Sequence, residues 1–463
     1  MATIKKRNRT YKITVSCGYD INGRQIRKHL SWTPPDGMTE RQEKKELQRQ
    51  AVLFEEQCRT GQQLNGSIKF ADFAEQWLND YASMNVRENT VNSYRFYLSR
   101  VMPAIGHIRL DKLQPHHLQK LYKNLSEEGI RRDVKMRSRN DFQLILDEKG
   151  MSQRAMAKRA GVSFSAISQL VHGKNISPES AEKIALALHR STQELFEPSK
   201  PHAVLSNNTI RHYHTAISTV LSTAVEWQII PFNPCTRIRP PKKTRQEQLY
   251  LDDTQAAELI AQLNQLPEDR MNFRTAIIML LFTGMRRSEV LGLYWSDIDL
   301  DNGVISVNRS LHYIPQKGCI DSDTKNSSSR RSFKAPAELI PLLKEYKQWQ
   351  QVRCEIAGDQ WHPSERVFTN WNGTPIRPDT LSNQFRKWIA TTDLPPIHLH
   401  SLRHTNASLL IASGTNIQTV ARRLGHSTSA TTANIYSHAI QSADAAAAEA
   451  VSVFKLNNEK QDR

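Results

Sequence analysis

The chain has 463 residues and a mass of 53.0 kDa, more than one hydrophobic core usually organises, so its length predicts several domains joined by linkers. Lys and Arg outnumber Asp and Glu by 63 to 46, and the net charge of +17 favours a polyanionic partner such as nucleic acid. No apolar run approaches the roughly 20 residues that span a bilayer, and the basic start does not continue into the apolar stretch of a signal peptide. These features argue against a membrane protein and predict a soluble protein of the cytoplasm.

The cysteines show neither a disulfide framework nor the spacing of a zinc knuckle, because they are odd in number and widely scattered. We therefore expect them to be reduced and structural. They are Cys17, Cys58, Cys235, Cys319 and Cys354.

The first predicted domain, residues 1–65, is small and basic, with 13 Lys and Arg against 7 Asp and Glu. A charged helical pattern covers residues 40–58, and residues 61–66 are typical of a linker. Before the helix, alternating residues around an Asn-Gly turn predict a small basic sheet. Its three expected strands are Tyr11–Val15, Arg24–Arg27 and a short run at Leu30 and Trp32.

A helical bundle is predicted for residues 67–130 and 205–235, where apolar residues recur at three- and four-residue intervals. One helix is expected around His117–Leu125. Another begins at Ser206–Thr209, where polar side chains can cap its first turn. The recurring apolar positions are Phe70, Phe73, Trp77, Leu78 and Tyr81, then Tyr94, Tyr97, Leu98 and Val101.

The two halves of the bundle are separated by residues 139–197, which we interpret as an inserted domain. Gly161 lies between two short helical patterns, with small and apolar residues where the helices would touch, as a helix-turn-helix requires. The segment resembles repressor-type helix-turn-helix domains, which implies DNA contacts from its second helix. The alternative is a packing or dimerisation module without DNA contact. The candidate DNA-binding residues are Gln153, Ser163, Phe164, Ser165 and Gln169.

A basic, proline-containing linker, residues 236–247, precedes the last predicted domain, residues 248–455. That domain is expected to be mostly helical, with short strands at about 303–333 and an alanine-rich helix at Ala443–Ala450. Residues 456–463 form a short tail. The predicted fold class is therefore mainly α with small β-sheets, in several domains.

Five short segments of the last domain supply the groups that phosphodiester cleavage without water requires. That reaction needs a nucleophile that forms a covalent intermediate, a proton donor for the leaving oxygen and fixed positive donors for the crowded phosphorane. Tyrosine can attack, the planar fork of arginine suits the non-bridging oxygens, and lysine or histidine can move protons. The segments are Thr283–Glu289, Thr324-Lys325, His400–His404, Leu424–His426 and Ile435–His438.

His400 and Arg403 are three residues apart, so a helix would direct both from one face toward a shared phosphate. With the other segments, this pattern resembles the tyrosine recombinase family, the integrases of phages and transposons. The resemblance covers most of the chain and implies a multidomain architecture. Its parts are an N-terminal arm-binding sheet with a helix, a core-binding bundle that the insertion interrupts, and a mixed α/β catalytic domain.

The resemblance implies six catalytic residues. Two arginines clamp the phosphate, two histidines donate to it, a lysine assists the leaving group and a tyrosine attacks. In that order they are Arg286 and Arg403, His400 and His426, Lys325, and Tyr436. The implied product is a 3′-phosphotyrosine with a free 5′ hydroxyl, so no metal or nucleotide cofactor is expected.

The resemblance also implies the partners and the biological role. We expect double-stranded DNA with core-type and arm-type sites, four protomers in a synapse, and an excisionase or DNA-bending accessory protein. No membrane partner is expected. The reaction would integrate or excise a mobile element such as a prophage.

Two metal sites are alternative interpretations. His398, His400 and His404 could bind a metal ion, although no nearby Cys or carboxylate would neutralise a dication there. The run of three carboxylates from Asp297 to Asp301 could serve a two-metal nuclease, but we favour a solvated turn before a hairpin.

Three catalytic candidates also have structural interpretations. Arg286 could pair with Glu289 at a helix start, Lys325 could be a solvated loop residue, and Tyr436 could be a core aromatic residue. At the level of function, the alternatives are a transcriptional regulator that acts through the inserted domain, and a topoisomerase that relaxes DNA without an attachment site.

Overall fold

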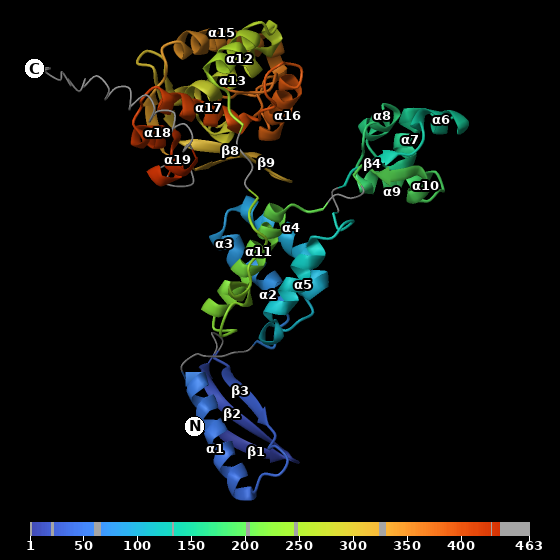
Figure 1. Ribbon diagram of the computed structural model, residues 1–463, viewed down its shortest axis with the longest axis vertical. Helices are drawn as coiled ribbons and strands as arrows, with labels where there is room; N and C mark the ends of the chain where they lie inside the picture. The colour runs from blue at the N-terminus through green and yellow to red at the C-terminus, as the bar shows by residue number, and fades with distance from the viewer. Residues whose placement is uncertain are drawn as a thin grey trace, which may run out of the picture. The chain divides into compact units, whose positions relative to one another are not determined.

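The computed structural model describes residues 2–19, 23–59, 66–131, 134–200, 204–244, 249–323, 330–426 and 428–435. The chain divides into two compact units, Met1–Arg245 and Gln246–Arg463. Helices predominate, and the sheets within the described ranges have two or three strands each (Figure 1), so the predicted fold class is confirmed. None of the helices in these ranges is long and apolar enough to cross a membrane.

Several expectations concern positions outside the described residues. They are most of the linker at residues 61–66, part of the linker at residues 236–247, the alanine-rich helix at Ala443–Ala450 and the tail at residues 456–463.

The N-terminal sheet is three-stranded, as expected, but one of its strands was predicted wrongly. The positions assigned to a second and a third strand, Arg24–Arg27 and Leu30 with Trp32, belong to one strand. The remaining strand is the basic segment at the start of the chain, where a single Ile among lysines gives little alternation, and it is specified by pairing with the central strand. The elements are β1 (Thr3–Arg7), β2 (Thr10–Tyr19), β3 (Gln25–Trp32) and the covering helix α1 (Glu40–Arg59), in the sheet order β1-β2-β3.

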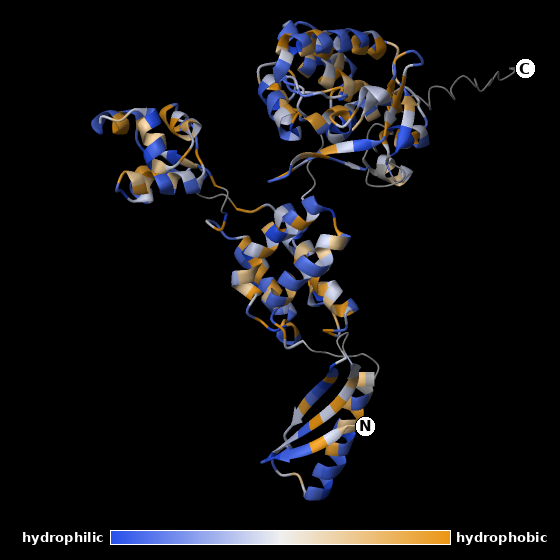
Figure 2. Cartoon of the chain, turned by 180° about the vertical axis from the view of Figure 1, so that it is seen from behind, coloured by the Kyte–Doolittle hydropathy of each residue, from blue (hydrophilic) through white to orange (hydrophobic). Residues whose placement is uncertain are grey.

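Helices from both sides of the insertion share one hydrophobic core, as predicted. Trp77 illustrates this, since its buried indole Nε1 donates to Thr223 Oγ1 at 3.0 Å across the insertion. In Figure 2, hydrophobic and hydrophilic residues alternate along these helices, because each buries one side. The elements are α2 (Phe70–Gln76), η1 (Trp77–Ala82), α3 (Ser83–Asn85), α4 (Glu88–Ile105), η2 (Leu110–Lys112), α5 (Pro115–Leu125), α11 (Asn207–Glu226) and η3 (Pro234–Arg237).

The inserted segment has a hydrophobic core of its own. Each of its helices begins at an Asp or Ser whose side chain accepts a backbone N–H, and Gly161 ends α7 with a left-handed φ of 62°. A short sheet, which the sequence did not predict, joins the two ends of the segment. The elements are β4 (Met136–Ser138), α6 (Phe142–Glu148), α7 (Gln153–Ala160), α8 (Phe164–Val171), α9 (Pro178–Ala187), α10 (Thr192–Leu195) and β5 (Phe196–Pro198).

The second unit is built around α13 (Met271–Thr283), a helix whose side chains are almost all buried. The remaining helices are α12 (Asp253–Asn264), η4 (Glu268–Arg270), α14 (Arg287–Val290), η5 (Trp295–Asp297), α15 (Leu339–Ala357), η7 (Gly358–Gln360), α16 (Pro378–Ile389), α17 (Leu399–Ala412), α18 (Ile417–Leu424) and α19 (Ser429–Ile435). The predicted short strands are present as β6 (Ile298–Asp299), β7 (Val304–Val307), β8 (Arg309–Ile314), β9 (Gly318–Asp323) and β10 (Arg331–Lys334). They form a sheet in the order β10-β7-β6 and a β8-β9 hairpin.

The expectation of a solvated turn at residues 297–301 is wrong for Asp297. Its carboxylate is buried, and it accepts hydrogen bonds from the Tyr294 backbone N–H at 2.9 Å and from Asn308 Nδ2 at 2.8 Å. Arg309 completes its neutralisation through an ion pair. Asp299, in contrast, accepts hydrogen bonds within an exposed turn. Asp297 is therefore a structural residue that fastens the hairpin.

Candidate active site

Arg286 lies at the N-terminal end of α14, where Glu289 holds both its backbone and its side chain. The Arg286 backbone N–H donates to Glu289 Oε2 at 2.9 Å, and Nη1 donates to Glu289 Oε1 at 2.7 Å. The structural interpretation of this pair is therefore correct as local geometry. The pair with Glu289 leaves part of the guanidinium available for other contacts. Its Nη2 donates to the Gly425 carbonyl at 3.1 Å, and the Arg286 side chain remains 37% exposed.

The helix α17 carries His400 and Arg403 and packs on the C-terminal end of α13. Arg403 is buried, and its Nη1 donates to the Gly284 carbonyl at 2.8 Å, two residues before Arg286. Asn406 strengthens this contact, since its Nδ2 donates to the carbonyls of Leu281 and Phe282 at 2.9 and 3.2 Å. Three carbonyls at the C-terminal end of α13 are thus bonded to α17, which brings the Arg403 side chain close to the segment that carries Arg286.

Gly284 permits this close packing. It ends α13 with a φ of 63°, a conformation that L side chains rarely adopt. A Cβ at this position would lie 2.6 Å from Asn406 Oδ1 and 2.6 Å from a methyl of Leu424. Only glycine therefore allows α17 and α18 to approach the start of the Arg286 segment.

His426 enters the site from a third segment, directly after α18. Gly425 ends that helix with a left-handed φ of 70°, and its carbonyl is the acceptor for Arg286. The Nδ1 atom of His426 is hydrogen-bonded at 2.8 Å to Thr432 Oγ1, which is fully buried on α19. This bond fixes the orientation of the ring.

The three histidines of the site are neutral at pH 7. Partial burial lowers the pKa of His400 to about 4, with further contributions from the charges of Arg403, His398 and Arg286, although the side chain itself remains exposed. Burial and the same two arginines lower the pKa of His426 to about 4, and burial beside His400 does the same for His404. These effects are those expected of imidazoles beside fixed cations, and they describe a site that favours an anion.

The described residues thus bring together four of the six predicted catalytic residues: Arg286, His400, Arg403 and His426. Lys325 and Tyr436 lie outside the described residues. The strand β9 ends two residues before Lys325, and α19 ends at Ile435, directly before Tyr436.

The alternative metal site has no support from this geometry. The His398 and His400 rings are 6.4 Å apart, and the His400 and His404 rings meet edge to face at 4.8 Å. His398 is hydrogen-bonded to Ser401, and His404 is buried against the helix. Across the described ranges, no three His, Cys, Asp or Glu side chains are grouped as metal ligands.

Three residues that the sequence did not assign to the site also take part in its construction: Glu289, Arg331 and Asn406. Glu289 was noticed only as a local partner of Arg286. Arg331 and Asn406 carry no sequence signal, because their partners lie far away in the chain.

The candidate DNA contacts of the insertion surround the start of α8. Ser163 caps this helix by accepting from the Ala166 N–H, while Phe164, Ser165 and Gln169 are exposed. Gln153, at the start of α7, is half-buried.

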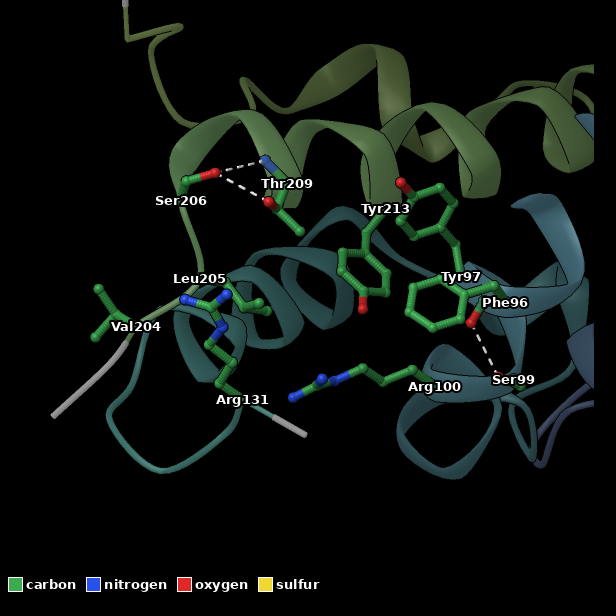
Figure 3. Close-up of a pocket in the computed structure, with 10 residues that line it drawn as sticks. All are labelled: Phe96, Tyr97, Ser99, Arg100, Arg131, Val204, Leu205, Ser206, Thr209 and Tyr213. Atoms are coloured by element: carbon green, nitrogen blue, oxygen red, sulfur yellow. Dashed lines mark hydrogen bonds between the residues drawn. The ribbon is translucent and has the colours of Figure 1, made fainter. Parts of the chain in front are cut away.

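A cavity of about 650 Å³ lies in the first unit, between α4, α11 and the two chain segments that flank the insertion (Figure 3). Tyr97 and Tyr213 pack edge to face there, and Arg100 and Arg131 add positive charge. None of the eleven predicted site residues lines it, so it is separate from the chemistry described above.

Comparison with known proteins adds three family matches. Residues 250–442 match the phage integrase family, residues 69–126 match the phage integrase N-terminal SAM-like domain, and residues 143–195 match a helix-turn-helix domain. The last match coincides with the inserted segment.

Two relatives and one solved structure illustrate the similarity. The chain is 30% identical over 235 residues to the ICEBs1 integrase of Bacillus subtilis, which covers 50% of this chain and 62% of that protein. It is 31% identical over 272 residues to a XerC-like tyrosine recombinase of Caldanaerobacter subterraneus, with 55% of this chain and 67% of that protein covered. It thus spans less than two thirds of the first relative and about two thirds of the second.

The solved structure is that of the Tn1549 transposon integrase in complex with transposon right end DNA. The TM-score is 0.54 at 17% identity, and the similarity covers 83% of this chain and 99% of that one. This similarity establishes a shared fold. Together with the matches in sequence, it shows that the chain belongs to the phage integrase family of tyrosine recombinases.

Proposed function

We propose that this protein is a site-specific DNA recombinase that cuts and rejoins DNA through a covalent 3′-phosphotyrosine intermediate and so integrates or excises a mobile element. The observation that carries the proposal is the meeting of Arg286, Arg403 and His426, from three separate segments, around one positively charged site. Family membership supports the same conclusion.

In the proposed reaction, Arg286 and Arg403 bind the non-bridging oxygens of the scissile phosphate, while His400 and His426 donate further hydrogen bonds to it. Arginine suits this task because its planar group donates two parallel hydrogen bonds and stays charged at any working pH. Because such donors act mainly on charge that develops in the transition state, they lower the barrier rather than raise DNA affinity.

Tyr436 is the proposed nucleophile. Its phenolic oxygen attacks phosphorus and forms a new P–O bond, while the bond to the 5′ oxygen breaks and Lys325 gives that oxygen a proton. His400 is neutral before DNA binds, because burial and the charge of Arg403 lower its pKa, so one ring nitrogen can accept the phenol proton while the other donates to the phosphate. A 5′ hydroxyl of the partner duplex then attacks the phosphotyrosine and gives its proton to Lys325. The bond to the Tyr436 oxygen breaks, His400 returns a proton to that oxygen, and the strands are rejoined without a cofactor.

A nicked suicide substrate tests the proposal, because loss of the short 5′ fragment traps the covalent adduct. Wild-type protein should form a DNA adduct that Tyr436→Phe abolishes. Tyr250→Phe is the matched control, since Tyr250 is an exposed tyrosine of the same unit. If the wild type forms no adduct, or if Tyr436→Phe still forms it, the proposal is wrong. Relaxation of supercoiled DNA without any attachment site would instead support a topoisomerase.

The insertion is proposed to be an additional DNA-binding module. Three features support this role. The insertion has a separate core, its helices α7 and α8 are both capped, and the side chains of Phe164, Ser165 and Gln169 are exposed. Ser163 and Gln153 complete the proposed contacts. If the module alone provided the function, the protein would be a transcriptional regulator, and the suicide substrate distinguishes that case because a regulator forms no adduct.

We further propose that the basic N-terminal sheet binds arm-type DNA and that the bundle and the catalytic unit bind core-type DNA. Four protomers would act in each synapse, with an excisionase or a DNA-bending protein as accessory factor. Because the substrate is cellular DNA, the reaction would take place in the cytoplasm.

A further inference from the structure

We propose that Arg331 is a positioning residue of the recombination site, one that fixes Arg286 and the segment before His426 relative to each other. The proposal rests on the proposed function and deepens it. Arg331 is the first residue of β10, a strand that carries none of the six predicted catalytic residues.

Two hydrogen bonds of Arg331 reach opposite sides of the site. Its Nη2 donates to Glu289 Oε2 at 2.8 Å, and its Nε donates to the Arg423 carbonyl at 2.7 Å. Glu289 uses the same carboxylate to hold the backbone and the guanidinium of Arg286. Arg423 lies three residues before His426. One side chain therefore connects the two segments that present Arg286 and His426.

Burial makes this connection rigid. The Arg331 side chain is only 5% exposed and that of Glu289 only 3%, so water does not compete for their hydrogen bonds. Burial alone would raise the pKa of Glu289, but the hydrogen bond and charge of Arg331, with Arg286, hold it below the usual value. The carboxylate is consequently charged at neutral pH and accepts from both arginines at once.

Gly425 allows the close approach of Arg331. A Cβ on Gly425 would lie 2.9 Å from Arg331 Nη1, so the glycine leaves space for the guanidinium as well as adopting a left-handed φ. The carbonyl of the same residue accepts from Arg286. Arg331 and Arg286 thus both lie against Gly425 and restrict its position.

A lysine at position 331 could not form both of these hydrogen bonds. Its ammonium is a single point donor on a flexible stem, whereas Arg331 uses Nε and Nη2, two atoms of one rigid plane, for two acceptors on different segments. Loss of one bond would let Arg286 and His426 move relative to each other, and a misplacement of about 1 Å can cost about 100-fold in rate.

Arg331→Lys in the full chain is the first test, with Arg330→Lys as the matched control. Arg330 is the preceding residue, and its side chain is 61% exposed and paired with Asp323. On the suicide substrate, Arg331→Lys should slow adduct formation by about 100-fold with unchanged DNA affinity, and Arg330→Lys should not. Equal rates for the two variants would overturn the proposal.

A second substrate separates positioning from a folding defect. Replacing a non-bridging oxygen of the scissile phosphate by a methyl group removes the negative charge that the arginines stabilise. The deficit of Arg331→Lys should then shrink, as should that of Arg286→Ala, because the correctly placed cation matters less. A deficit that is equal on both substrates would mean fewer folded molecules and would refute the positioning role.

A third measurement tests whether Arg331 acts through Glu289. Glu289→Gln should show the same substrate dependence, and the double variant should be little slower than the slower single variant, since both changes release the same group. Additive losses would contradict the proposal. Absence of any Tyr436-dependent adduct in the wild type is a different result, which would refute the proposed function instead.

Discussion

Two nitrogen atoms of the Arg286 guanidinium are held before any substrate binds. Glu289 neutralises one side of the guanidinium, and the Gly425 carbonyl accepts from another. A cation that is fixed in this way needs little reorganisation when charge develops on a phosphate, which is the condition under which fixed donors are most effective. The exposed part of the Arg286 side chain remains available to bind the substrate.

The first prediction concerns the two arginines. Arg286→Ala and Arg403→Ala should each lower the rate of adduct formation by about 100-fold or more while changing DNA affinity little, because a residue directed at the transition state affects the chemical step. Single-turnover cleavage and a DNA titration measure the two quantities. Arg287→Ala is the control, since Arg287 points to Asp379 and Ser382. Equal losses of rate and affinity would show a merely structural role.

The second prediction concerns the histidines. His404 is buried with a pKa of about 4 and returns to about 6.5 when unfolded, so the unfolded chain binds more protons between these values. The free energy of unfolding should therefore be constant above pH 6.5 and fall between pH 6.5 and pH 4, by at most about 3 kcal/mol for this residue. Urea denaturation of the full chain at several pH values measures it.

His404→Gln should reduce this pH dependence by the contribution of His404, whereas the control His362→Gln, at an exposed histidine outside the site, should leave it unchanged. A slope that is the same in both variants would mean that other groups cause it. Binding of the anionic phosphate should raise the pKa of His400 and His426, since it opposes the nearby arginines.

Two of the predicted catalytic residues lie just after the ends of helices. The left-handed glycines at the C-terminal ends of α13 and α18 both have a crowded Cβ position. Each of them is followed within two residues by a predicted catalytic residue, Arg286 or His426. The tightly packed helix ends therefore restrict the positions that Arg286 and His426 can adopt.

The third prediction separates two effects of a new Cβ at Gly284, which ends α13: steric crowding and backbone strain. Gly284→Ala should destabilise the catalytic unit by about 1–3 kcal/mol beyond the strain of a positive φ, because its Cβ meets Asn406 and Leu424. Gly414→Ala is the matched control, with a φ of 78° and nothing within 4 Å of the new Cβ. Urea denaturation compares the two. Equal destabilisation would show that only the backbone conformation matters.

The elements that the sequence predicted well are those with local signals. The helix α11 begins after Ser206, whose side chain accepts the Thr209 N–H. Of the periodic residues of α4, Leu98 and Val101 are buried, and Tyr94 and Tyr97 are half-buried against the same core. The strands β1, β4 and β5 were missed because their pairing partners, and not their own residues, specify them. Asp297 was misjudged for the same reason, since Asn308 and Arg309 bury it.

The inserted module begins and ends at one place, where its two terminal strands pair. The strands β4 and β5 pair antiparallel, so the chain enters and leaves the module at adjacent positions, and Glu197 is ion-paired to Arg137 and Arg139 there. Because its hydrophobic core is also separate, the module is inserted without interrupting the core of the bundle.

The fourth prediction follows from this closure. Deletion of residues 134–200 should leave the bundle folded and the cleavage of a minimal core site at the wild-type rate, while abolishing any DNA contact made by the module. Suicide-substrate cleavage, circular dichroism and DNA footprinting measure these outcomes. Gln169→Ala, which alters only an exposed side chain, should affect the footprint alone. Loss of cleavage on deletion would show that the insertion is part of the core clamp.

The catalytic candidates, the helical bundle and the inserted module can be predicted from the amino-acid sequence alone, because motif spacing, helix caps and helical periodicity involve only a few neighbouring residues. Which of those groups meet depends on the packing of segments that are distant in the chain. Arg403 contacts Gly284 across 119 positions, Arg286 contacts Gly425 across 139, and Arg331 contacts Glu289 across 42. Such contacts have no local signature, since they arise only when buried helices and strands pack and their polar groups must find partners.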